Sequence, residues 1–276
     1  MLAKISSILG TGLVLGLSPV AAAPASASEA LSPRGRVQLD AVVANNGEGS
    51  TFTGGEVRRL YLGVDGDLSE AVSYVVEADF SGPEVVLQDV ALTYQATPSL
   101  ELVAGHFKPP VTHEDLTSDT QTLFLERSSF AGAFAPGRRV GVAANYARER
   151  WGLQGGVFGE AEQNALDGEA GEARLLALRA YGDLLPGEAA LHLGASAYHL
   201  DASSWGPTVR LAQRPETARV PRALDTGRFA ADEAQFLGLE AGFGLGPLTV
   251  QGEGGGIDYD GPVVRPPFSG DREGVA

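Results

Sequence analysis

The 276-residue sequence contains no cysteine and almost no lysine. Without cysteine the chain cannot carry a disulfide scaffold, and it has no thiolate for metal binding or nucleophilic catalysis. The two lysines are Lys4 and Lys108, and the formal net charge is −15. Proteins that bind nucleic acid need a basic stripe along their surface. This balance of charge therefore argues against nucleic acid as a partner.

Catalytic sequence motifs are missing as well. The sequence has no G-x-S-x-G elbow, no P-loop and no H-E-x-x-H. Among the histidines, neither His106 with His113 nor His192 with His199 has the spacing of metal ligands, and zinc needs three or four converging ligands. We therefore expect no enzymatic activity, no metal site and no cofactor.

The amino terminus has the order of a secretory signal peptide. A basic start, 1–4, precedes an apolar run, 5–20, and a small-residue stretch, 21–27, which ends in an A-x-A cleavage site at Ala25-Ser26-Ala27. The alternative is a membrane anchor, but glycines and a proline interrupt a run already short for spanning. Beyond residue 27 no apolar run of about 18 residues follows. We predict a cleaved signal peptide over 1–27 and one exported domain over 28–276.

Period-two alternation of apolar and polar residues runs through most of the chain. In its clearest example, Val72, Tyr74, Val76 and Phe80 fall on one face of a strand, opposite Glu77. About eleven such segments occur, each near the 9–11 residues of a tilted membrane strand. The predicted strands cover 34–44, 55–66, 70–81, 84–96, 98–107, 138–148, 151–160, 173–183, 187–201, 235–245 and 247–258.

Short and long links alternate between the predicted strands. The short turns lie at 65–68, 96–98, 148–150 and 245–247, and the long links at 45–54, 108–137, 161–172 and 202–234. No helix is predicted in these links. Bacterial outer-membrane barrels have this asymmetry, with short periplasmic turns and long external loops. The pattern favours an all-β fold, a transmembrane antiparallel β-barrel, in which 108–137 is the third external loop.

The strand count predicts a barrel that is incomplete at its C-terminus. An odd number of strands cannot close a bacterial single-chain antiparallel barrel. An open edge in lipid would leave backbone donors and acceptors unpaired. We therefore expect the sequence to be part of a longer reading frame.

The first half of the chain also carries short motifs in a distinctive order. They are GRVQLDA at 35–41, RRLYLGV at 58–64, YVVEADF at 74–80, VAGHFKPP at 103–110, EDLTS at 114–118, FLER at 124–127 and FAPGRRVGV at 134–142. Together they resemble the phosphate-selective porin family, the porin O and P group. The resemblance implies a homotrimer in the outer-membrane lipid, with barrels of about sixteen strands. It further implies an inward-folded third external loop and passive diffusion of small anions such as phosphate.

An anion path needs fixed positive charge facing the water-filled lumen. Alternation places four basic residues on the lumen side, and the loop or its base adds three more. These candidates are Arg36, Arg59, Arg139, Arg179, Lys108, Arg127 and Arg138. Arg127 is the leading constriction candidate. Each of them could instead be structural, with Arg127 paired to Glu126 or Glu114, and Arg138 and Arg139 paired to Asp79 or Glu101.

The acidity of the chain leaves the selectivity open. Predicted lumen-facing acids outnumber the predicted basic residues, and a negative lumen favours cations. These acids are Asp40, Asp65, Glu77, Asp79, Asp89, Glu101 and Glu240. A general or cation-preferring porin therefore remains the alternative, followed by an outer-membrane barrel enzyme and by a soluble periplasmic β-sandwich.

Overall fold

The computed structural model describes residues 10–13, 31–45, 51–122, 124, 126–159, 174–185, 189–201, 211–213, 224–226, 229–260 and 263–264. Its long strands are β2 (Ser32–Asn45), β3 (Thr51–Ser69), β4 (Val72–Asp79), β5 (Val86–Thr97), β6 (Leu100–Phe107), β7 (Arg139–Arg148), β8 (Trp151–Phe158), β9 (Arg174–Asp183), β10 (Ala189–Asp201), β14 (Glu233–Leu245) and β15 (Leu248–Asp260). The short strands are β1 (Gly10–Leu13), β11 (Ala212–Gln213), β12 (Leu224–Asp225), β13 (Phe229–Ala230) and β16 (Val263–Val264), and the helices are α1 (His113–Leu116) and α2 (Ser129–Phe134).

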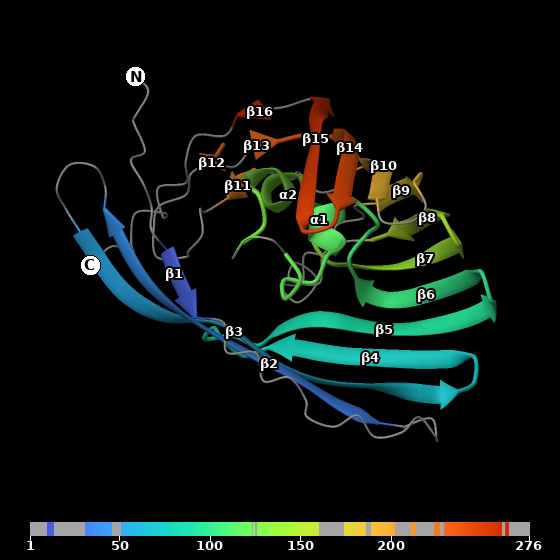
Figure 1. The fold of residues 1–276 in the computed structure, drawn as a ribbon, viewed down its shortest axis with the longest axis horizontal. Coiled ribbons are helices and arrows are strands. Elements are labelled where there is room, and N and C mark those ends of the chain that lie inside the picture. Colours follow the sequence, from blue (N-terminus) through green and yellow to red (C-terminus); the bar gives the residue numbers. More distant parts are fainter. Residues whose placement is uncertain are drawn as a thin grey trace.

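The long strands form a single curved antiparallel sheet. Its 12 strands follow the order β1 to β10, then β14 and β15, so almost every strand pairs with its neighbour in sequence. The sheet bends into an arc, and α1 and α2 lie on its concave side (Figure 1). Within the described part of the chain the arc is not closed, because β1 and β15 stand at opposite edges of this order. The fold is all-β, consistent with a β-barrel porin.

Each segment predicted to be a strand is a strand, but some links differ from the prediction. β3 continues to Ser69, so the turn predicted at 65–68 lies at Glu70 and Ala71. The two helices in the 108–137 link were not predicted, because four and six residues are too short to show helical periodicity. The short strands β11, β12 and β13 lie in the link predicted at 202–234.

Apolar side chains face outward and polar ones are covered, as the alternation predicts for a barrel wall. In β14, Leu237 and Leu239 are 61% and 64% exposed, whereas Phe236 and Glu240 on either side of this pair are buried. β9 has the same pattern. A convex face of exposed aliphatic residues, with charged residues such as Arg179 and Glu240 on the covered face, is the arrangement of a membrane barrel.

A β-bulge in β5 brings Gln88 to the covered face, although strict alternation would place it on the side of the exposed Leu92 and Tyr94. Val76 pairs with Val90 and Ala78 pairs with Leu87, so two residues of β5, Gln88 and Asp89, oppose one residue of β4. Bulges re-aim side chains in this way. Gln88 is consequently buried, and Leu87 takes an exposed position.

The hydrophobic core lies between the concave face and the segment 108–137. Val111 packs with buried residues of β7 to β10 and β14, and the side chains of Phe130 and Phe134 border the cluster. The ring centroids of Phe130 and Phe134 lie 6.1 and 6.2 Å from the ring centroid of Phe236. The segment is therefore held by apolar burial as well as by polar contacts.

Gly105 of β6 allows β5 and β6 to approach closely. Its φ is +144°, and an added Cβ would lie 2.6 Å from the Cα of Ala91. We expect Gly105→Ala to destabilise the protein by about 1–3 kcal/mol, measured as the urea midpoint of unfolding in detergent. Gly254→Ala in β15 is the matched control, because no atom of the described residues lies within 4 Å of its added Cβ. Equal midpoints for the two variants would contradict this account.

The amino-terminal strand β1 pairs with β2 along Gly10 to Leu13. These residues belong to the predicted signal peptide, whose cleavage stays a prediction. Among the described residues, neither helix has the length and apolar character needed to cross a membrane.

Candidate functional site

The segment 108–137 crosses the concave face, and its first part is fastened to β10 and β15. The backbone N–H of Thr112 donates to Ser196 Oγ at 3.3 Å. The N–H groups of His113 and Glu114 both donate to Glu253 Oε2, at 2.9 and 3.3 Å. Helix α1 begins there, with the Thr112 side chain as its N-cap. These contacts join residues more than eighty positions apart in the sequence.

The second part of the segment is fastened around α2. Ser128 caps this helix, and its N–H donates to Glu114 Oε2 at 2.9 Å. The Tyr198 hydroxyl of β10 donates to the carbonyl oxygen of Phe134 at 3.3 Å. Side chains of the surrounding strands thus hold both helices, with Glu253 at the start of α1 and Tyr198 at the end of α2.

Three arginines from β2 and β3 meet two carboxylates of the segment. Arg59 pairs with Asp119 at 2.7 Å and with Glu126 at 2.9 Å. Arg58 pairs with Glu126 at 2.6 Å, and Arg36 pairs with Asp119. All five side chains are largely buried. The cluster therefore ties the middle of the segment to the strands opposite α1.

A second β-bulge brings two consecutive arginines into this cluster. Gln38 pairs with Arg59 and Leu39 pairs with Val57, so Arg58 is the extra residue of β3. Strict alternation would send Arg58 and Arg59 to opposite faces, whereas the bulge lets both reach Glu126. The paired arginines at 58–59 are visible in the sequence, but only the bulge shows that both side chains reach the same face of the sheet.

Two further basic residues lie at the start and centre of the segment. Lys108 Nζ pairs with Asp115 at 2.9 Å, and burial lowers the pKa of the Lys108 ammonium while Asp115 opposes that shift. Arg127 donates to the carbonyl oxygens of Glu114 and Thr117, at 3.0 and 2.8 Å. Arg127 Nε also lies 3.7 Å from Asp115. These contacts fold the segment onto itself.

A buried ion pair joins β9 to β14 beneath α1. Arg179 donates to both carboxylate oxygens of Glu240, and the two side chains are 7% and 4% exposed. His192 of β10 places its Nε2 2.9 Å from Glu240 Oε1 and its Nδ1 3.0 Å from Asp183 Oδ1. The His113 ring lies beside the His192 ring, tilted by 41°, with the ring centroids 5.2 Å apart. Burial lowers the pKa of His113, which is therefore neutral at pH 7.

A cavity of about 810 Å³ opens between the segment and the strands β10, β14 and β15. Among the described residues, four carboxylates line it together with Arg127, His113 and His192. The acidic lining residues are Glu114, Glu126, Glu240 and Glu253. A water-accessible space between an inner segment and a sheet is where a porin would place its narrowest point.

The model of the phosphate-selective porin O and P family matches residues 33–266. The chain belongs to this family. It is 35% identical over 236 residues to an uncharacterized protein of Caulobacter vibrioides, and the match covers 79% of this chain and 47% of that protein. The chain therefore spans about half the length of this relative. Membership of the family points to an outer-membrane porin rather than an enzyme.

Most of the predicted basic residues of this porin-family chain pair with acidic partners, in several separate groups. Arg36, Arg59, Lys108, Arg127, Arg138 and Arg179 each pair with a carboxylate. Arg139 donates to the carbonyl oxygens of Pro136 and Gly159, at 3.3 and 3.1 Å. Their role in an anion path stays a prediction. The geometry adds Arg58 and Asp119, which were absent from the predicted set, and it pairs Glu126 with Arg58 and Arg59.

Some predicted partners are wrong. Arg138 pairs with Asp89, through Nε at 3.0 Å and Nη2 at 3.2 Å, and not with Asp79 or Glu101. Alternation placed Asp89 on the lumen side, but it could not tell which arginine outside its own strand the carboxylate would meet. Arg127 contacts Glu114 through its backbone carbonyl oxygen, whereas its carboxylate partner is Asp115.

Proposed function

We propose that this protein is an outer-membrane porin that lets small hydrophilic solutes, principally anions such as phosphate, diffuse passively through a water-filled barrel. The observation that carries the proposal is the inner segment 108–137, which is bound by polar and apolar contacts across the concave face of a sheet whose convex face is apolar. Such a segment narrows the lumen without blocking it, because a cavity remains beside it.

Anion passage is supported by the arginine cluster at Asp119 and Glu126. There the carboxylates of Asp119 and Glu126 pair with the guanidinium groups of Arg36, Arg58 and Arg59. Phosphate oxygens accept bidentate hydrogen bonds from guanidinium groups in the same way as carboxylate oxygens do. Among the described residues, the buried Arg36 Nε has no hydrogen-bond partner. A phosphate that approaches the cluster could therefore exchange with the carboxylates, and so bind and leave within the lumen.

The remaining parts of the proposal concern the assembled protein. The signal peptide at 1–27 would direct export, and the exposed apolar convex face would contact outer-membrane lipid. The long loops would connect strands on the external side of the membrane, where 108–137 folds inward, and the short turns would lie on the periplasmic side. A homotrimer with barrels of about sixteen strands follows from the family. No cofactor is needed, since the solute gradient drives diffusion.

Recording of single channels in planar bilayers tests the proposal. We expect discrete conductance steps in chloride, and a chloride current that falls when phosphate is added at low concentration. Arg127→Ala removes the cation that lines the cavity, so block should weaken about fivefold, or ~1 kcal/mol. Arg150→Ala, exposed in the β7–β8 turn, is the matched control and should leave block unchanged.

Each failure of this experiment has a separate meaning. Conductance that phosphate leaves untouched would retain the pore and remove phosphate as its solute. If phosphate blocked the Arg127→Ala channel as it blocks the wild type, the role of Arg127 would be limited to holding segment 108–137 in place. Folded protein that forms no channels would overturn the pore itself.

A general or cation-preferring pore is the second candidate. It is favoured by the pairing of the predicted basic residues with carboxylates and by the four carboxylates that line the cavity. A negative lumen attracts cations. The sign of the reversal potential in a potassium chloride gradient separates this candidate from the anion pore.

A further inference from the structure

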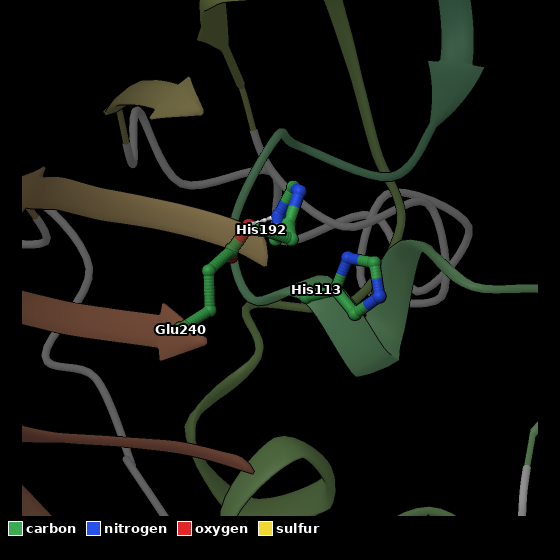
Figure 2. Close-up of side chains that lie close together, drawn as sticks. All are labelled: His113, His192 and Glu240. Carbon is green, nitrogen blue, oxygen red and sulfur yellow. Dashed lines mark hydrogen bonds and ion pairs between the residues drawn. The ribbon is translucent and has the colours of Figure 1, made fainter. Parts of the chain in front are cut away.

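Three potential metal ligands from distant parts of the chain converge beside the cavity. His113 begins α1, His192 lies in β10 and Glu240 lies in β14, and their side chains approach one another (Figure 2). One donor atom from each lies within 4.8 Å of the other two. All three residues line the cavity. This cluster was not predicted from the sequence, because it combines His113 with His192, and each of them was considered only with the histidine nearest to it in the sequence.

Asp183 orients His192 in the way that metal-binding histidines are oriented. Its carboxylate lies 3.0 Å from Nδ1, while Nε2 points to Glu240 Oε1 at 2.9 Å. When Nδ1–H donates to Asp183, the lone pair of the neutral imidazole is on Nε2. A carboxylate that holds the far nitrogen of a histidine fixes its tautomer and raises its basicity as a ligand.

We propose that His113, His192 and Glu240 bind a divalent transition-metal ion such as zinc. Two imidazoles and one carboxylate form a ligand set that zinc uses, with the fourth tetrahedral position left for water. Tetrahedral ligands at about 2.1 Å from the metal lie about 3.4 Å apart. The donor atoms of His192 and Glu240, which lie 2.9 Å apart, therefore need to separate slightly. Rotation of the His113 ring needs to bring its donor nitrogen closer to them by about 1 Å or more.

The charge around the site favours a cation despite the nearby arginine. Arg179 already donates to Glu240, so the metal must share that carboxylate with a guanidinium group. Glu253 and Glu114 line the same cavity, and Glu253 Oε1 is buried without a hydrogen-bond partner among the described residues. An unpaired buried carboxylate oxygen is costly, and a nearby divalent ion would lower that cost.

A bound ion would fasten α1 to the barrel wall. His113 belongs to the inner segment, whereas His192 and Glu240 belong to neighbouring strands that pair with each other. The ion would add a cross-link between them beside the cavity. This inference concerns metal binding alone and does not rest on the proposed pore function.

Isothermal titration of the folded protein in detergent micelles with zinc chloride tests the site. We expect one zinc per chain, and a loss of affinity of at least about tenfold in His113→Ala and in His192→Ala. Asp183→Asn should cost about tenfold as well, because the orientation of His192 is lost. His199→Ala, on the same strand as His192, is the matched control and should bind zinc like the wild type. Calcium should not compete, since it prefers oxygen ligands.

The outcomes separate a real site from incidental binding. Folding of each variant is checked by circular dichroism. Asp183, whose side chain is 56% exposed, provides a variant that folds even if His192→Ala does not. Wild-type affinity in His113→Ala, or in Asp183→Asn, would overturn the proposal, as would an equal loss in His199→Ala. The absence of stoichiometric zinc binding to the folded wild type would overturn it directly.

Discussion

Replacement of Arg179 by alanine is expected to lower the free energy of unfolding by about 3–5 kcal/mol. The Arg179 and Glu240 side chains are 7% and 4% exposed, so the substitution leaves an almost fully buried carboxylate without its main partner. Removal of one partner from a buried ion pair costs more than the pair contributes, because the remaining charge stays desolvated. His192 still contacts Glu240, which places the effect toward the lower end of that range.

Urea unfolding in detergent with EDTA, followed by tryptophan fluorescence, measures this effect. EDTA keeps metal ions from replacing the lost charge. Arg148→Ala is the matched control, because Arg148 is exposed at the end of β7, where its guanidinium group contacts the exposed side of the neighbouring Tyr146 side chain. Exposed substitutions of this kind change stability by about 0.5 kcal/mol or less. An equal effect of the two substitutions would contradict a structural role for the buried pair.

Replacement of Glu126 by glutamine is expected to shift the pore toward anions. Glu126 neutralises two arginines at once, Arg58 at 2.6 Å and Arg59 at 2.9 Å. The amide keeps the size and a hydrogen-bond acceptor but removes the charge. One unit charge at about 4 Å contributes about 1 kcal/mol even in water, so the ratio of anion to cation permeability should rise about fivefold.

The reversal potential in a potassium chloride gradient gives this ratio directly. Glu149→Gln makes the same chemical change in the exposed β7–β8 turn, and it should leave the potential unchanged. An unchanged potential in Glu126→Gln would mean that ions do not pass near the arginine cluster. A shift toward cations would contradict the assigned electrostatics.

The strands and their faces could be predicted from the sequence because they depend on neighbouring residues. Side chains alternate between the faces of a strand with a period of two, so exposed Leu237 and buried Phe236 follow from the local pattern. The same holds for Arg179, which lies on the covered face as predicted. The motifs at 35–142 likewise identified the family before any contact was known.

The candidate site could be predicted only in part, because its residues are far apart in sequence. Arg59 and Arg127 were named, but not the partners Asp119 and Asp115 that hold them. Bulges changed the side of two residues: one extra residue in β3 turned Arg58 inward, and another in β5 turned Gln88 inward. A bulge depends on the partner strand, and alternation within one strand contains no information about it.

The sequence by itself determined the all-β class, the strand positions, the apolar outer face and the family, since each follows from local periodicity or from motifs in order. Only the tertiary structure decided which charges neutralise each other and which ligands converge. His113 and His192 are 79 positions apart, yet their rings lie 5.2 Å from each other. That distance results from the path of segment 108–137 across the curved sheet, which depends on burial and ion pairs with many strands at once.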